Sequence, residues 1–333
     1  MSRLIDSLSR RQALALPLLA AAGCRPRAEA PGVLRLGFFA SVAHAPALTL
    51  AASGRLAAGL PGVRVETAIF NAGPEAMTAL STRSIDACLV GPLPAATHFL
   101  RSRGRALRVL SGVCSGGSAL VVRPGAGVRG ARDLRGKTVG TPQLGSSQDV
   151  ALRRYLRANG LRDSASGGEV RIANTASAHI ASLFQRGHLD GAWLPEPWVS
   201  RLEALGARVL VDERALWPQG SFASAVLVAH PRYAAAAPDN LARLLRMVHA
   251  EVEAAERDRL AGLPRLRDAI RALTRVELSA AILARAATRM RFTLDPLPAS
   301  VGRMVRDAQG LGMLPPGDIA GLFDGEPLRR ALA

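Results

Sequence analysis

Short apolar runs alternate with stretches of helical periodicity along the chain from residue 33 onward. A short apolar run bounded by Gly or Pro is typical of a buried strand, whereas apolar side chains at every third or fourth position indicate a helix that packs on one face. Strands that take turns with helices in this way predict an α/β architecture with mainly parallel sheets. The expected strands are 33–38, 63–70, 86–90, 107–113, a run that ends at 122, 138–140, 170–173, 190–193, 209–211 and 225–229.

Helical periodicity fills most of the sequence between these runs. Pro46 near the first turn marks the start of the first expected helix, at 46–58. A long C-terminal stretch from Asp239 onward carries apolar residues at helical spacing, and we expect it to be helical throughout. The other helices are expected at 74–80, from the Gly91-Pro92 turn to 101, from 146 to a stop at 159–160, at 177–186 and from 197 onward.

The strands fall into two sets, which predicts two α/β lobes joined by two crossings of the chain. The first set and the C-terminal helices make one lobe, at 33–120 and 214–333, and the second set makes the other, at 121–213. In open α/β sheets, ligands bind in the crevice outside the carboxyl ends of the strands. A ligand cleft between the lobes would therefore be lined by the loops at 40–44, 91–92, 114–118, 142–147 and 194–197.

One segment resembles a nucleotide-binding loop but has the wrong order of elements. Residues 131–138, ARDLRGKT, fit a loose phosphate-loop pattern with Ala131 in place of the usual first Gly. A working phosphate loop follows a strand and opens a helix, so that backbone N–H groups converge on the phosphates. Here a helical turn comes first and a strand follows. The segment therefore predicts a turn that feeds a strand, and no nucleotide is expected.

The next turn, QLGSSQ at 143–148, has the order that the first one lacks. It follows a strand and precedes a helix, with Ser146 at the cap position. Free N–H groups and hydroxyl donors at the start of a helix form a site for an anion or a polar oxygen. Because every capped helix has such groups, Ser146 and Ser147 either bind a ligand or only cap the helix.

The N-terminus has the pattern of an export signal. Basic residues precede an apolar run at 13–22 that is too short to span a bilayer. The end of this segment, Ala-Gly-Cys24, resembles a lipobox, in which the cysteine thiol is acylated and becomes the new N-terminus. We therefore expect a signal at 1–23, a linker at 24–32 and a periplasmic or other extracytoplasmic location with a lipid anchor in the membrane. Arg10-Arg11 also resembles a twin-arginine signal, so the export route stays open.

Composition excludes several classes of protein. Lys and Arg number 43 against 26 Asp and Glu, and the net charge of +17 would suit a nucleic-acid partner. However, aromatic residues are only 4%, the cations are almost all Arg spread over helix faces, and the chain carries an export signal, so no nucleic acid is expected. Neither an H-E-x-x-H spacing nor a G-x-S-x-G elbow occurs. We expect no metal, no cofactor and no catalytic residue.

Two cysteines remain besides Cys24. Cys88 and Cys114 both lie in strand-like stretches. They could form one disulfide in an oxidising compartment, or they could be two small buried thiols.

Several stretches occur together in the order and spacing of one known family. They are LGFFASVAHAPAL, FNAGPEAMTAL, SIDACLVGPLPAA, SGGSALVV, GKTVGTPQLGSSQDVALRRYL and LDGAWLPEPWVSRL. In these stretches the sequence resembles the periplasmic substrate-binding proteins of aliphatic sulfonate, taurine and nitrate ABC importers. The resemblance implies a two-lobed periplasmic-binding-protein fold of type II, a venus flytrap, that closes on a small solute. It also implies an ABC permease and its ATPase as partners and no chemistry of the chain's own. We expect a monomer.

The resemblance also implies which residues line the site. Position by position it carries over His44, the Gly91-Pro92 turn, the Ser-Gly-Gly-Ser stretch at 115–118, the polar helix start at 146–148 and Glu196. The sequence departs from the family at Ala40-Ser41, where Pro-Asn is usual, and at Leu93, where a polar residue is common. Both departures leave the identity of the ligand open. The predicted ligand-binding residues are Ser41, His44, Gly91, Pro92, Ser115, Ser118, Gln143, Ser146, Ser147, Gln148 and Glu196.

Each candidate also has a simpler structural role. Ser115 and Ser118 could only form a tight turn, and His44 could be a capping or exposed residue. Glu196 would repel an anion, so it would pair a ligand ammonium or guanidinium, orient a donor, or fix its own Pro-Glu-Pro loop. For the whole chain, the alternatives are an extracytoplasmic sensor or enzyme on the same fold, and a binder of a thiamine-precursor pyrimidine.

Overall fold

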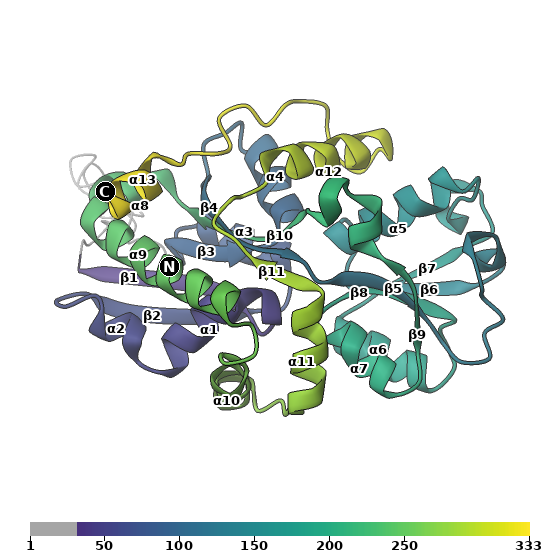
Figure 1. The fold of residues 1–333 in the computed structure, drawn as a ribbon. Helices are drawn as coiled ribbons and strands as arrows, with labels where there is room; N and C mark the ends of the chain where they lie inside the picture. The colour runs from purple at the N-terminus through teal and green to yellow at the C-terminus, as the bar shows by residue number, and fades with distance from the viewer. Residues whose placement is uncertain (1–31) are drawn as a thin grey trace, which may run out of the picture. The chain divides into compact units, whose positions relative to one another are not determined.

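The computed structural model describes residues 32–333. The predicted export signal, the lipidation site at Cys24 and nearly all of the expected linker lie outside the described residues. Within 32–333 the chain forms two β-sheets flanked by helices (Figure 1). The predicted α/β architecture is confirmed. No helix of this part of the chain is both long and apolar enough to cross a bilayer.

The first sheet has six strands in the order β11-β4-β10-β3-β1-β2. β1 pairs in parallel with β2 and β3, whereas β10 runs antiparallel to β3 and β4. A strand from the C-terminal half of the sequence therefore lies in the middle of a sheet built mainly by the N-terminal half. The bounds are β1 (Val33–Phe39), β2 (Arg64–Phe70), β3 (Ala87–Val90), β4 (Arg108–Gly116), β10 (Ala223–Ala229) and β11 (Met290–Phe292).

The second sheet has five strands in the order β7-β6-β8-β5-β9. β6 pairs in parallel with β7 and β8, and β5 runs antiparallel to β8 and β9. Each sheet thus combines parallel strands with antiparallel ones: β5 in the second sheet, and β10 and the edge strand β11 in the first. The bounds are β5 (Ser118–Val122), β6 (Thr138–Thr141), β7 (Arg171–Asn174), β8 (Gly191–Pro195) and β9 (Arg208–Asp212).

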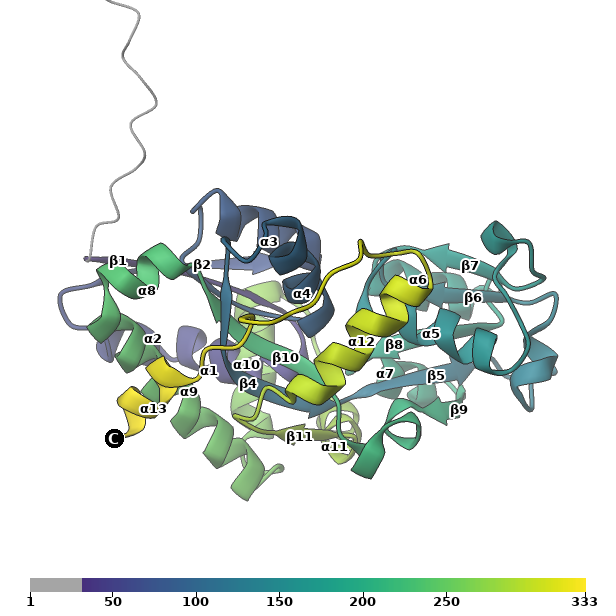
Figure 2. The ribbon, with the colours of Figure 1, turned by 90° about the horizontal axis from the view of Figure 1, so that it is seen from above.

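Helices lie on both faces of each sheet (Figure 2). In β3, Ala87 and Leu89 face one apolar cluster while Cys88 and Val90 face another. Strands buried on both faces have continuous apolar sequences, which is why the apolar runs predicted them. The helices are α1 (Ala45–Ala52), α2 (Arg55–Ala58), α3 (Gly73–Ser81), α4 (Pro92–Arg101), α5 (Ser147–Ala158), α6 (Ser177–Gln185), α7 (Trp198–Ala204), α8 (Pro231–Ala236), α9 (Pro238–Arg257), α10 (Leu263–Thr274), α11 (Ala280–Thr288), α12 (Pro298–Gly310) and α13 (Glu326–Leu332).

Cys88 and Cys114 are free and buried. Cys114 belongs to the apolar cluster on one face of the first sheet and Cys88 to the cluster on the other. A disulfide needs the two Cβ atoms about 4 Å apart, which side chains on opposite faces of a sheet cannot reach. Burial raises the pKa of both thiols, to about 12 for Cys114. Of the two alternatives, the structure has two buried thiols.

The chain crosses from the first sheet to the second at Gly117, between β4 and β5. Residues 118–120, which the predicted boundary assigned to the first lobe, pair instead with β8 and β9. Gly116 and Gly117 have φ angles of +81° and +79°, a region that favours glycine. A Cβ atom at Gly116 would lie 2.5 Å from the carbonyl oxygen of Arg289. The crossing therefore requires glycine for both backbone conformation and space.

Two helical predictions were wrong in detail. The helix expected at 46–58 is divided into α1 and α2, because Gly54 adopts φ of +72° between them. The C-terminal stretch that was expected to be helical throughout contains β11, which pairs with β4 at the edge of the first sheet. A three-residue strand has too few residues to show a period of two, so its pairing with a distant strand decides its structure.

The second crossing holds a buried carboxyl group. Glu213 begins the turn after β9 and is 2% exposed. Its oxygens accept the indole N–H of Trp193 at 2.8 Å and that of Trp217 at 3.4 Å. Burial raises the pKa of Glu213 to about 7. Because the ordinary value is 4.5, the folded protein holds a proton here that the unfolded chain releases as the pH rises above about 5.

We expect Glu213→Gln to remove a pH-dependent loss of stability. In the native protein this carboxyl group lowers the free energy of unfolding progressively between about pH 5 and pH 8, by about 3 kcal/mol at most. Urea unfolding at pH 5 and pH 8 measures this, as the difference between the variant and the native protein at each pH. That difference should shift in favour of Glu213→Gln as the pH rises, while the exposed control Glu66→Gln should show no such trend. A difference that is the same at both pH values would contradict the assignment.

Candidate functional site

The loop after β6 leads directly into α5, as the sequence predicted. Ser146 is the N-cap of this helix, and its hydroxyl oxygen accepts the backbone N–H of Asp149 at 3.2 Å. The carbonyl oxygen of Ser146 accepts the N–H of Val150 at 3.0 Å. Among residues 32–333, the N–H groups of Ser147 and Gln148 then have no backbone or side-chain acceptor. They form a pair of free donors at the positive end of the helix dipole.

Asp149 holds this loop in place from beneath. Its side chain is fully buried, and Oδ2 accepts the backbone N–H of Gly145 at 3.0 Å. Oδ1 accepts the Thr141 hydroxyl at 3.2 Å and the Asn174 amide at 3.0 Å. Arg153, one turn further along α5, donates to Oδ2 at 3.2 Å. Because its oxygens have these four donors, Asp149 positions the free donors of α5 without facing a ligand itself.

The predicted serines of the Ser-Gly-Gly-Ser stretch have different environments. The Ser118 hydroxyl accepts the side-chain amide of Gln148 at 3.1 Å, so these two predicted residues lie together. The Ser115 hydroxyl accepts the backbone N–H of Phe222 at 3.2 Å and lies within the first sheet. Gln143 contributes its backbone carbonyl to the N–H of Ser146 at 3.1 Å, which shapes the loop before α5.

The loop after β1 carries a buried neutral histidine. His44 is 5% exposed, and its ring lies 5.0 Å from the ring of Phe39. Burial lowers the pKa of His44 to about 3, so the imidazole is uncharged at neutral pH. Its Nδ1 atom is buried and has no hydrogen-bond partner among the described residues. A neutral imidazole of this kind offers one unused hydrogen bond and no charge.

The start of α4 provides fewer donors than that of α5. Gly91 is its N-cap and Pro92 its first residue. Because Pro92 and Pro94 lack N–H groups, Leu93 is the only one of the first three residues of α4 that carries a backbone donor. Leu93 is itself buried and shares a small pocket with Ser147 of α5. The starts of α4 and α5, which pack on different sheets, therefore lie close to each other.

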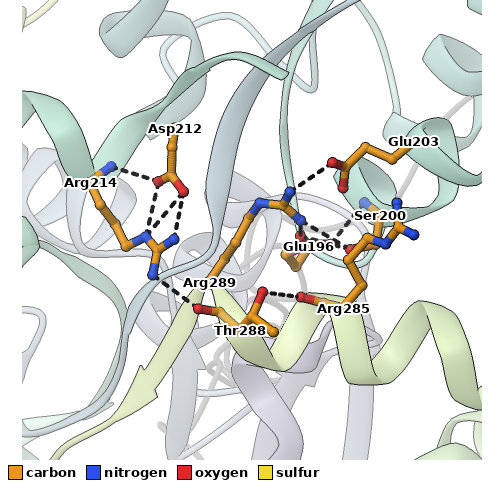
Figure 3. Close-up of polar contacts among 8 residues, drawn as sticks. All are labelled: Glu196, Ser200, Glu203, Asp212, Arg214, Arg285, Thr288 and Arg289. Carbon is orange, nitrogen blue, oxygen red and sulfur yellow. Dashed lines mark hydrogen bonds and ion pairs between the residues drawn. The ribbon is translucent and has the colours of Figure 1, made fainter. Parts of the chain in front are cut away.

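Glu196 lies where several of these loops meet. Its backbone carbonyl accepts the Ser41 hydroxyl at 3.4 Å, and its N–H donates to the carbonyl of Gly117 at 2.7 Å. Its carboxylate accepts the backbone N–H of Ser200 at 3.1 Å and the Ser200 hydroxyl at 3.0 Å. Arg289 donates to the same carboxylate at 3.0 Å (Figure 3). Burial raises the pKa of Glu196, and the N–H and hydroxyl of Ser200 and the positive charge of Arg289 oppose that rise.

These contacts connect the five loops that the sequence placed at the cleft. Ser41 touches the loop of Glu196, that loop touches Gly117, Ser118 touches α5, and Ser147 of α5 shares a pocket with Leu93 of α4. The donors in these loops are neutral N–H and hydroxyl groups. Within residues 32–333 no three His, Cys, Asp or Glu side chains gather as metal ligands would.

Sequence reasoning missed two residues that organise these loops. Asp149 is not among the predicted site residues, although an acid three residues after an N-cap serine is a known capping signal that pointed to it. Arg289 could not be found in the same way, because it lies 93 residues from Glu196 in the sequence.

Comparison with known proteins agrees with this architecture. The solved structure of the alkanesulfonate-binding protein SsuA from Xanthomonas axonopodis pv. citri is 23% identical, with a TM-score of 0.71 over 86% of this chain and 95% of that chain. The nitrate-binding protein NrtA from Synechocystis PCC 6803 is 13% identical, with a TM-score of 0.75 over 90% of this chain and 88% of that chain. The predicted two-lobed periplasmic-binding-protein fold is thereby confirmed.

Comparison of sequences places the chain in a family. A protein of Brucella abortus that is named only as a binding protein is 26% identical over 189 residues. That match covers 56% of this chain and 56% of the length of the curated relative, so the chain matches only about half of that protein. The family model for the NMT1-like family matches residues 27–261, well over half of the chain. In agreement with the resemblance seen in the sequence, the chain belongs to the NMT1-like family.

Proposed function

We propose that this chain is the extracytoplasmic solute-binding component of an ABC importer and that it captures a small anion. An aliphatic sulfonate, taurine or nitrate is the kind of ligand that suits its donors. On this proposal the chain delivers the solute to a membrane permease driven by an ATPase, acts as a monomer, and is held at the membrane by a lipid on Cys24. The family and the fold support the general role, and the geometry at the start of α5 supports the anion.

The observation that carries the proposal is the pair of free N–H groups at Ser147 and Gln148. A sulfonate or a nitrate keeps its charge at any physiological pH and needs several hydrogen-bond donors, but it does not need a proton. Backbone N–H groups at the start of a helix supply such donors, and the helix dipole favours the negative charge. The hydroxyls of Ser146 and Ser147 add neutral donors, and the Nδ1 atom of the uncharged His44 adds one unpaired hydrogen-bonding nitrogen.

Binding of a small anion is the direct test of this function. Isothermal titration with methanesulfonate, propane-1-sulfonate, taurine and nitrate should give a micromolar or tighter Kd for at least one of them. At a free ligand concentration 100 times Kd, the same ligand should raise the free energy of unfolding by roughly 2.7 kcal/mol. If no member of this panel binds or stabilises the protein, the proposed anion-binding function is wrong.

The serines at the start of α5 should contribute to affinity beyond their role in capping. We expect Ser146→Ala combined with Ser147→Ala to weaken anion binding by more than tenfold, because two hydroxyls next to the free N–H groups are lost. The matched control is Ser279→Ala, which removes the N-cap of α11, where the hydroxyl accepts the N–H of Ile282 at 3.2 Å. Losing a cap costs about 1 kcal/mol of stability, so the control should lower stability and leave Kd unchanged. An unaltered Kd in the double variant would reduce both serines to capping residues.

A further inference from the structure

Two acidic side chains beside the predicted site loops, Asp149 and Glu196, are fully engaged with the protein itself. Asp149 accepts four hydrogen bonds beneath the start of α5. Glu196 is 1% exposed, and its two oxygens are shared between Ser200 and Arg289. Neither carboxylate has an oxygen without a donor. Neither Asp149 nor Glu196 therefore offers a ligand an unpaired negative charge.

Arg289 is the residue that neutralises Glu196, and it is connected to the other sheet. It follows α11 and precedes β11 of the first sheet, whereas Glu196 follows β8 of the second. Its Nη1 atom donates to Glu196 at 3.0 Å and its Nη2 atom to Glu203 at 2.8 Å. The Arg289 side chain is only 12% exposed, and that of Glu196 is 0% exposed. Figure 3 shows the guanidinium group between the two carboxylates.

A buried ion pair of this kind controls where charge is available. Taking a carboxylate out of water is costly, and an arginine that reaches two carboxylates with separate N–H groups offsets that cost. Removing the arginine leaves the carboxylate as an uncompensated buried charge, and that charge attracts any other cation within reach. Glu196 contacts the candidate site through its own backbone, because its carbonyl oxygen accepts the Ser41 hydroxyl.

We infer that Arg289 is a specificity-determining residue, which withdraws the charge of Glu196 from the site and so restricts the ligand to simple monoanions without an ammonium group. This inference rests on the proposed function and narrows it. An alkanesulfonate or nitrate finds neutral donors in the site and leaves no charge unpaired. A zwitterion such as taurine brings an ammonium group that loses its water and gains no carboxylate in exchange.

The sharpest probe is a pair of ligands with the same shape. Propane-1-sulfonate and taurine differ in having a terminal methyl or a terminal ammonium group on the same short chain. The native protein should bind propane-1-sulfonate at least tenfold more tightly than taurine, measured by isothermal titration at pH 8.

Three variants then assign this preference to Arg289. Arg289→Ala frees the Glu196 carboxylate and should reduce the ratio of the two affinities to less than threefold. Adding Glu196→Gln to Arg289→Ala removes the freed charge and should restore the native ratio. The matched control is Arg35→Ala, which breaks an equally buried ion pair, 2.8 Å long, between Arg35 of β1 and Asp86 just before β3. This control should lower stability but keep the ratio. If Arg289→Ala does not fold, Arg289→Gln, which keeps donors without the charge, takes its place.

Each outcome decides the inference. Equal binding of the two ligands by the native protein, or an unchanged ratio in the Arg289 variant, would overturn it and leave the proposed anion binding intact. Binding of neither ligand while nitrate or methanesulfonate binds would also overturn it. Failure of all four anions would instead overturn the proposed function.

Discussion

The backbone hydrogen bonds of Gly117 hold the two sheets together at the first crossing of the chain. Its N–H donates to the carbonyl of Arg289 at 2.9 Å, and its carbonyl accepts the N–H of Glu196 at 2.7 Å. The side chains of these two partners then form their own ion pair at 3.0 Å. Backbone and side chains thus close one ring of contacts around the crossing. Only a residue without a Cβ atom fits there, because Met290 occupies the space that a side chain at Gly117 would need.

The same ring places the loops of the site relative to one another. Glu196 contacts Ser41, in the loop after β1, and Ser200 of α7. A shift of its loop would therefore move donors beside both sheets. Asp149 has the corresponding role beside the second sheet, where its carboxylate accepts the N–H of Gly145 and holds the turn before α5 in place. The acidic residues therefore give the site its shape, and neutral groups are left to meet a ligand. An anion would encounter no repelling charge from either carboxylate, since each is surrounded by donors.

The sequence predicted those features that depend on local pattern. Strands buried on both faces appear as apolar runs, and the start of α5 follows from Ser146 at the cap position after a strand. Features set by distant contacts could not be predicted in this way. Residues 118–120 are as apolar as a strand of either sheet, and only their pairing with β8 and β9 assigns them. β11 is too short for its period to be visible, and the ion pair of Arg289 joins residues 93 positions apart.

The double role of Arg289 constrains how the ligand preference of this chain can change. Any substitution of Arg289 alters the charge available near the site. It also alters the contact between the two sheets at the crossing. Changes at neutral positions such as Ser41, Leu93 and Ser118 carry no such cost, because their side chains make at most one hydrogen bond to the rest of the protein. The departures from the family pattern seen at Ala40-Ser41 and Leu93 are of this second kind. Ligand preference among anions can therefore diverge through the neutral loops while the ring around Gly117 is kept, whereas acceptance of a cationic group requires the ring itself to change.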